Sequence, residues 1–147
     1  MDTAKCKVLL VDDDRGITRG LAGIVDWSKY GCEIAGQAHN GQSGFELAME
    51  IDPHVIVTDI RMPRMDGLEM IRRIKERNSR TKFIILSGYS EFEYAKEGMR
   101  LGVNHYVLKP VEEQELEQCV AEVVGHFRND PQPAAGTERE AGCRRPK

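Results

Sequence analysis

Long apolar runs are missing from the 147 residues of this chain. No stretch approaches the roughly 20 apolar residues that a membrane-spanning helix needs. Residues Met1 to Lys7 also lack the basic-then-apolar layout of a secretory signal peptide. Cysteine is scarce: the chain has 4, and they form no C-x-x-C pair, which argues against a zinc site or a disulfide framework. We therefore expect thiols in a reducing cytoplasm, and no contact with a membrane.

An excess of charge of either sign is lacking too. Lys and Arg number 21 and Asp and Glu 24, for a net charge of -3, so bulk charge does not favour binding to nucleic acid. The 4 histidines are scattered and form no H-x-x-x-H metal pair. Hydrophobic residues make up 40% of the chain, which is ordinary for a globular protein. The length allows one domain with a proper core.

Short apolar segments alternate with segments of helical periodicity. Strands are predicted at residues 7–11, 33–38, 55–58, 83–86 and 105–108. Helices are predicted at 17–27, 41–51, 67–77, 91–101 and 114–127. Three of the predicted strands are nearly continuous in Val, Ile, Leu and Phe, which is typical of strands buried on both faces of a parallel sheet. The alternation predicts an α/β fold, a three-layer, doubly wound (βα)5 sandwich.

One domain is predicted over residues 5–128. From residue 129 to residue 147 the chain is rich in Pro, Gly, Ala and charge, and has no large apolar side chain. Such a segment cannot bury enough surface to offset the entropy of ordering it. We expect a disordered linker or tail there.

Polar residues follow four of the predicted strands. Asp12 and Asp13 come after the first, Asp59 after the third, Ser87 after the fourth and Lys109 after the fifth. The carboxyl ends of parallel strands meet at one edge of a sheet, where ligands bind. We therefore expect these side chains to share one crevice.

Carboxylates, a hydroxyl and an ammonium at one edge favour phosphate chemistry. Crowded carboxylates repel each other, and a cation relieves the repulsion. All-oxygen ligation with room for water suits Mg²⁺. An ammonium and a hydroxyl can bind phosphoryl oxygens, and a carboxylate can be the nucleophile that forms an aspartyl phosphate. Catalysis of such a transfer consists mostly of positioning and charge neutralisation, which these groups provide.

Four segments resemble the receiver domains of two-component response regulators, the CheY-like family, and the resemblance extends over residues 5–128. They are VLLVDDD (8–14), VIVTDIRMPRMDGLEMI (55–71), FIILSGYSEFEYA (83–95) and HYVLKP (105–110). The resemblance implies a flavodoxin-like sheet with strand order 2-1-3-4-5. Residues 26–41 are similar to receivers that precede AraC-type DNA-binding domains. The implied output is transcription regulation, through a DNA-binding domain that is absent from this chain.

The resemblance also implies a role for each acidic residue. Asp59 would be the phosphoacceptor. Asp13 and Asp59 would ligate Mg²⁺, with Asp12 acting mainly through a bound water. The backbone carbonyl of Arg61 would be a further ligand.

The remaining implied roles concern the switch and the partners. Ser87 would be the switch hydroxyl, Tyr106 the aromatic that changes rotamer, and Lys109 the cation that reaches the phosphoryl group. The bond from Lys109 to Pro110 is expected to be cis. A sensor histidine kinase would donate the phosphoryl group, and a second copy of the chain could bind through the fourth helix, fifth strand and fifth helix. The protein would be a signalling switch rather than an enzyme.

Two other functions are open to these residues. A phosphohydrolase of the haloacid-dehalogenase type also uses a strand-end Asp, a Ser or Thr, a Lys and Mg²⁺. Asp12 and Asp14 imitate its opening motif, but Gly16 stands where its threonine is expected. The second alternative is a receiver-like interaction module that is never phosphorylated, against which the complete set of polar residues argues.

Two local patterns are left out of the predicted functional site. Asp14 is predicted to cap a helix and is left out of the site. Residues 36–43 approach the phosphate-binding loop pattern G-x-x-x-x-G-K-[ST], but Gln42 replaces its lysine, so nucleotide binding is rejected there.

Overall fold

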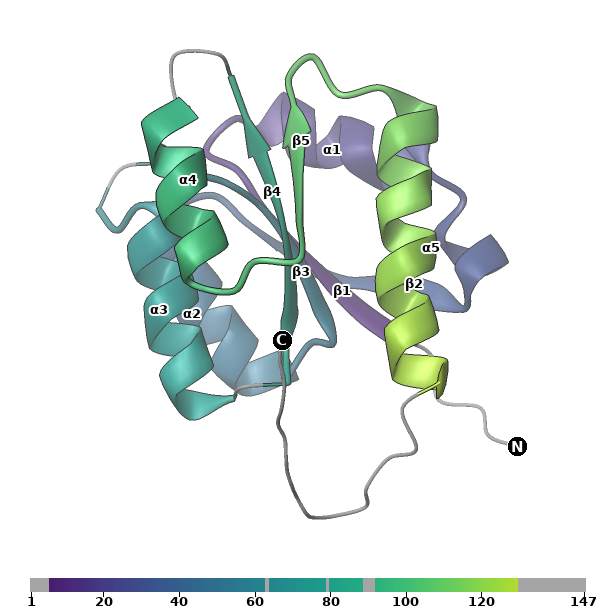
Figure 1. Ribbon diagram of the computed structural model, residues 1–147, viewed down its shortest axis with the longest axis horizontal. Helices are drawn as coiled ribbons and strands as arrows, with labels where there is room; N and C mark the ends of the chain where they lie inside the picture. The colour runs from purple at the N-terminus through teal and green to yellow at the C-terminus, as the bar shows by residue number, and fades with distance from the viewer. Residues whose placement is uncertain (1–5, 63, 79, 89–91, 130–147) are drawn as a thin grey trace.

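The computed structural model describes residues 6–62, 64–78, 80–88 and 92–129. Strands and helices alternate along this part of the chain (Figure 1). The strands are β1 (Cys6–Val11), β2 (Cys32–Ala38), β3 (Val55–Asp59), β4 (Lys82–Ser87) and β5 (His105–Leu108). The helices are α1 (Arg15–Ile24), the 3-10 helix η1 (Trp27–Tyr30), α2 (Gly41–Ile51), α3 (Gly67–Arg77), α4 (Phe92–Arg100) and α5 (Glu113–Asn129).

All five strands lie parallel in one sheet. Their order is β2-β1-β3-β4-β5. Helices α1 and α5 cover one face, and α2, α3 and α4 cover the other (Figure 1). The predicted doubly wound α/β fold and its strand order are confirmed.

Successive strand residues supply two separate cores. In β1, Val8 and Leu10 pack with α1 and α5, whereas Leu9 and Val11 pack with α2 and α3. The same alternation holds in β3 and β4. Each fully buried Leu, Ile or Val contributes roughly 1.5–3 kcal/mol relative to an exposed one. Because both faces are covered, the buried middle of β1, β3 and β4 consists of consecutive apolar residues.

Helix α1 ends earlier than its apolar spacing predicted. The prediction ran to Trp27, but the helix stops at Ile24 and Val25 is extended. The chain then forms η1, whose Trp27 ring is buried and whose indole N–H donates to the carbonyl of Leu21 at 3.2 Å. Carbonyls in the last turn of a helix have no partner within the helix. The tryptophan therefore belongs to the same core as α1, but reaches it from a separate turn.

The structure defines the caps of two helix ends, and the one predicted at Asp14 is confirmed. Asp14 caps α1, since its side chain accepts a hydrogen bond from the Gly16 N–H at 2.9 Å. Gly102, after α4, has a φ of 90°, the left-handed conformation that favours glycine at this place. The predicted start of the same helix at Glu91 lies outside the described residues. So does the predicted tail, apart from Asn129.

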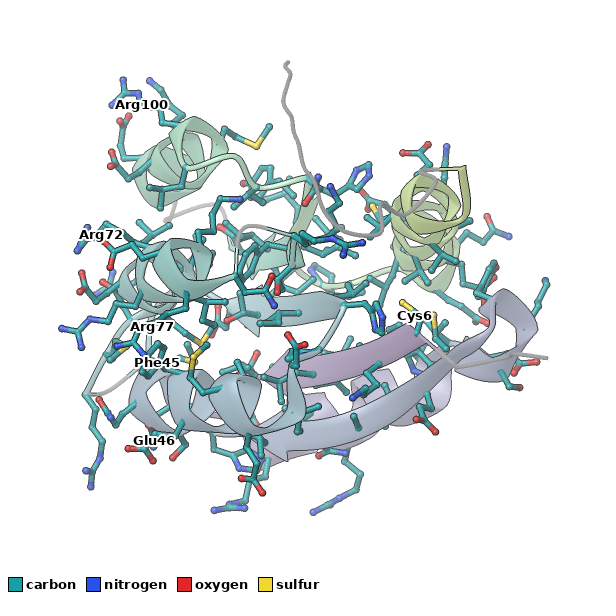
Figure 2. All side chains as sticks on the ribbon, turned by 90° about the horizontal axis from the view of Figure 1, so that it is seen from below. Cys6, Phe45, Glu46, Arg72, Arg77 and Arg100 are labelled. Atoms are coloured by element: carbon teal, nitrogen blue, oxygen red, sulfur yellow. The ribbon has the colours of Figure 1, made fainter. Side chains whose placement is uncertain are left out.

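Helices α2 and α3 pack side by side on their face of the sheet. The Arg77 guanidinium of α3 lies 5.7 Å from the ring centroid of Phe45 of α2, and Figure 2 shows the two side chains together. On its outer face α3 carries ion pairs from Glu69 to Arg72 and Arg73. Exposed pairs of this kind contribute little to stability. Within the described residues, no helix is both long and apolar enough to cross a membrane.

Candidate functional site

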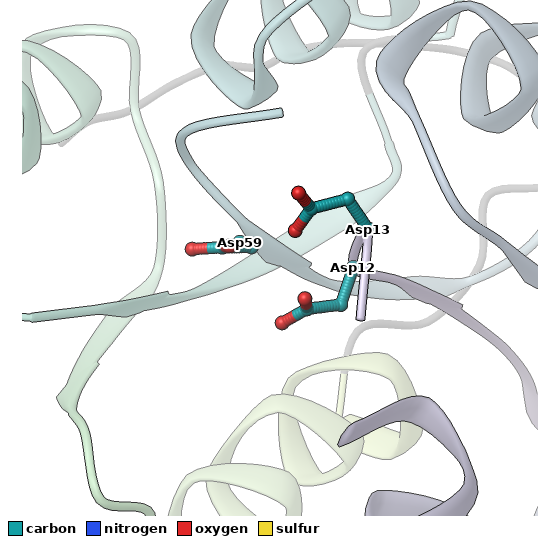
Figure 3. Close-up of side chains that lie close together, drawn as sticks. All are labelled: Asp12, Asp13 and Asp59. Atoms are coloured by element: carbon teal, nitrogen blue, oxygen red, sulfur yellow. The ribbon is translucent and has the colours of Figure 1, made fainter. Parts of the chain in front are cut away.

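Three aspartates meet at the carboxyl ends of two neighbouring strands. Asp12 and Asp13 follow β1, and Asp59 is the last residue of β3 (Figure 3). Carboxylate oxygens of all three lie within 4.8 Å of one another. Asp12 and Asp59 are buried, and Asp13 is exposed. A partly buried set of hard oxygen donors that opens to solvent on one side fits a divalent cation such as Mg²⁺.

Lys109 joins this cluster from the loop after β5. Its Nζ lies 3.3 Å from Asp12 Oδ2 and 3.4 Å from Asp59 Oδ2. Burial by itself lowers the pKa of Lys109, but the facing carboxylates of Asp59 and Asp12 outweigh it and the net shift is upward. The side chain therefore stays an ammonium at neutral pH. It neutralises part of the charge that the cluster concentrates.

Asp12 is the most deeply buried carboxylate of the cluster, with 1% exposure. Burial raises its pKa, and the negative charge of Asp13 adds to the rise. The backbone N–H of Asp14, which donates to Asp12 Oδ1 at 2.9 Å, and the Lys109 ammonium both oppose it. Loss of solvent around the buried carboxylate is therefore the main reason that ionisation of Asp12 is disfavoured.

Backbone contacts hold Asp59 at the end of β3. The N–H of Ile60 donates to Asp59 Oδ1 at 2.8 Å, and the hydroxyl of Thr58 donates to the carbonyl of Asp59 at 2.7 Å. Helix α3 begins so close to the same carbonyl that a Cβ on Gly67 would collide with it. Neither Thr58 nor Gly67 was predicted from the sequence as a site residue. The available signal was Thr58 itself, a polar residue in a strand otherwise buried and apolar, where a hydroxyl needs a partner.

Ser87 ends β4, fully buried, beside the backbone of the lysine. Its hydroxyl donates to the carbonyl of Gly88 at 3.0 Å. The backbone N–H of Lys109 donates to the carbonyl of Ser87 at 2.8 Å, which aligns the ends of β4 and β5. The peptide bond from Lys109 to Pro110 is cis, as predicted.

Two predicted site residues lie outside the cluster of charges. Tyr106 of β5 is half-buried and packs against the core under α2 and α3. Arg61 follows the buried Ile60 and has an exposed side chain. The roles assigned to Tyr106 and to the carbonyl of Arg61 stay predictions, as do the chemical roles of the other site residues.

Comparisons with known proteins agree with this geometry. A family model described as "Response regulator receiver domain" matches residues 8–121. The uncharacterized transcriptional regulatory protein YesN of Bacillus subtilis is 43% identical over 122 residues, which cover 83% of this chain and 33% of YesN. The transcriptional regulatory protein HptR of Staphylococcus aureus is 36% identical over 118 residues, covering 80% and 46% of the two chains. The chain thus spans less than half the length of these curated relatives.

Solved structures show the same fold. The receiver domain of AraT, a response regulator from Geobacillus stearothermophilus, has a TM-score of 0.82 and 35% identity, and the match covers 86% of this chain and 98% of that one. A two-component transcriptional regulator AraC from Clostridium phytofermentans has a TM-score of 0.80 and 29% identity, over 87% of this chain and all of that one.

Proposed function

Because this chain belongs to the response regulator receiver family of two-component systems, we propose that it accepts a phosphoryl group on Asp59 and signals by changing its conformation. The observation that carries the proposal is the buried pair of carboxylates, Asp12 and Asp59, with the Lys109 ammonium within 3.4 Å of both. A buried ion pair of this kind is not explained by stability alone, because the cost of removing the charges from water can exceed their mutual attraction. It suits a reaction in which negative charge arrives at Asp59.

The proposed step is a phosphoryl transfer from a sensor histidine kinase. A carboxylate oxygen of Asp59 attacks the phosphorus of a phosphohistidine, the phosphorus–nitrogen bond breaks, and the imidazole leaves with the bonding electrons. The product is an aspartyl phosphate. Lys109 neutralises negative charge on the phosphoryl oxygens. When bound, Mg²⁺ would supply further charge neutralisation, held by Asp12, Asp13, Asp59 and the backbone carbonyl of Arg61.

The proposed response is a shift between two conformations. The phosphoryl group would draw the Ser87 hydroxyl away from the carbonyl of Gly88, and Tyr106 would change rotamer with it. We propose a DNA-binding output in transcription regulation, because YesN and HptR are described as transcriptional regulatory proteins. A cytoplasmic location and action as a switch rather than an enzyme belong to the same proposal. The homodimer through α4, β5 and α5 has no support in the comparisons and stays a prediction.

Intact-mass analysis after incubation with acetyl phosphate and Mg²⁺ tests the function. The unaltered protein should gain the mass of one phosphoryl group, and Asp59→Asn should gain none. Asp66→Asn is the matched control, because Asp66 caps α3 outside the cluster and Asn caps equally well. An adduct that persists in Asp59→Asn and maps to Asp12 would support the phosphohydrolase alternative. No adduct on the unaltered protein would support the non-phosphorylated module.

A further inference from the structure

We propose that Thr58 is a positioning residue for the phosphoacceptor. Its hydroxyl holds the peptide group that follows Asp59, and through that group it holds the Asp59 carboxylate. The inference rests on the proposed function, because it concerns how fast Asp59 takes up a phosphoryl group.

The Thr58 hydroxyl is enclosed by the sheet. Thr58 is 0% exposed, in β3, and its register partners are Val11 of β1 and Ile85 of β4. A hydroxyl buried among apolar side chains needs a hydrogen-bond partner. Here it donates to the carbonyl oxygen of Asp59 at 2.7 Å, the usual distance for a hydroxyl donor.

One peptide unit links this contact to the carboxylate. The carbonyl of Asp59 and the N–H of Ile60 belong to the same planar group, so neither can rotate without the other. The Ile60 N–H donates to Asp59 Oδ1 at 2.8 Å. The Thr58 hydroxyl therefore limits the rotation of the peptide plane, and the plane in turn limits where Oδ1 lies. The other oxygen, Oδ2, is left 3.4 Å from Lys109 Nζ.

The same carbonyl is confined on a second side. A side chain on Gly67, the first residue of α3, would collide with the Asp59 oxygen, so only the bare backbone fits there. The N–H of Gly67 donates to the carbonyl of Ile60 at 2.6 Å. The Asp59–Ile60 peptide is thus held by a hydroxyl from β3 and by the start of α3. Transfer rates fall steeply when a reacting group is displaced by about 1 Å.

Three substitutions separate positioning from general stability. Thr58→Val keeps the branched shape and removes the donor, whereas Thr58→Ser keeps the donor. Thr81→Val is the matched control, because Thr81 is also buried and its hydroxyl donates to a backbone carbonyl, that of Pro53 at 3.3 Å, at the far end of β3 and β4. The rate of phosphorylation by acetyl phosphate with Mg²⁺ is measured by intact mass. The amide resonance of Ile60 is followed by nuclear magnetic resonance without any phosphoryl donor.

We expect Thr58→Val to slow phosphorylation by roughly 3- to 10-fold, the effect of one hydrogen bond, and to shift the Ile60 amide resonance. Thr58→Ser and Thr81→Val should stay near the unaltered rate. Equal rates for Thr58→Val and the unaltered protein would overturn the inference, and so would equal slowing in Thr58→Val and Thr81→Val. If Thr58→Val does not fold, Thr58→Ala takes its place in the same comparison.

The test also separates this inference from the proposed function. If the unaltered protein takes up no phosphoryl group, the proposed function fails, and the Ile60 resonance alone then decides whether Thr58 orients the peptide. If the Ile60 amide resonance of Thr58→Val is the same as in the unaltered protein, the positioning role is overturned, whether or not the unaltered protein takes up a phosphoryl group.

Discussion

Asp13 is the residue at which charge can be removed from the cluster with least disturbance to the packing. Its carboxylate is exposed, yet lies within 4.8 Å of the buried carboxylates of Asp12 and Asp59. We predict that Asp13→Asn raises the melting temperature by roughly 2–5 °C in the absence of divalent cations, because it relieves repulsion without opening a cavity. Differential scanning calorimetry in chelator measures the shift.

Asp14→Asn is the control for this substitution. Asp14 is the next residue in the chain, but its side chain caps α1, a role that Asn fills equally well. Its melting temperature in chelator should stay close to that of the unaltered protein. An equal rise in both variants would indicate a general effect of net charge and would contradict repulsion within the cluster.

His54 gives the stability a dependence on pH. Burial lowers its pKa from the ordinary value of 6.5, with Lys7 and Arg80 adding to the shift and Asp52 opposing it. Its Nδ1 accepts the backbone N–H of Lys7 at 2.9 Å, which requires an unprotonated nitrogen. A lowered folded-state pKa means that the unfolded chain binds the proton more tightly. The stabilising contribution is therefore present above about pH 6.5 and is lost as the pH falls through the lowered pKa.

Urea unfolding between pH 7.5 and pH 5 measures this loss. The midpoint of the unaltered protein should fall by roughly a few tenths of a molar. His54→Asn, which retains an acceptor for the Lys7 N–H, should show a smaller slope. Some slope should persist from His39, whose pKa is also lowered, first by burial and then by Arg15. A slope unchanged in His54→Asn would show that the titration lies elsewhere.

At the scale of elements, two helix glycines differ in the space around them: Gly67 begins α3 against the site, and Gly20 lies on an open face of α1. A methyl group on Gly67 would collide with backbone, whereas one on Gly20 of α1 would meet nothing within 4 Å. We predict that Gly67→Ala destabilises the protein by more than about 1 kcal/mol and slows phosphorylation, since Asp59 must move. Gly20→Ala should stabilise it by roughly 0.5–1 kcal/mol through helix propensity. Urea unfolding compares the two, and a shared sign would refute the packing argument.

Most elements were predictable because their apolar periodicity survives in the structure. The predicted bounds of α2, α3 and β5 match the observed ones. The predicted end of α1 was wrong. Apolar spacing alone does not distinguish a helix that continues to Trp27 from a separate turn that brings the Trp27 ring to the same core. Local sequence assigns Gly98 of α4 only a low helix propensity. In the structure it lies against Ile85, whose Cδ1 a Cβ would approach to 2.5 Å, a contact across elements that local sequence does not encode.

For the whole molecule, the acidic cluster couples a cation to global stability. A ligand that binds only the folded state at 100 times its dissociation constant stabilises it by about 2.7 kcal/mol. We predict that millimolar Mg²⁺ raises the melting temperature by several degrees in the unaltered protein and in Asp14→Asn. The rise should be largely absent in Asp59→Asn. A flat response in the unaltered protein would argue against a cation site.

The convergence of Asp12, Asp13, Asp59 and Lys109 could be anticipated from topology alone. Each follows a strand of a parallel sheet, and parallel strands end at one edge. Thr58 could not be anticipated in the same way, because its importance depends on a peptide plane and a 2.7 Å contact rather than on its position in the strand order. Sequence patterns locate groups at an edge, and the backbone that orients them becomes visible only in the fold.

The ion pair between Lys109 and Asp12 joins residues 97 positions apart. A ribosome makes Asp12 early and Lys109 late, so a nascent chain holds the acidic residues before it holds their cation. A polypeptide that ends before β5 lacks Lys109 and also lacks the residues of α5 that complete the core beside α1. We therefore predict that the proposed uptake of a phosphoryl group requires a chain that extends past β5, and that chains ending before Lys109 show no phosphoryl adduct by intact mass.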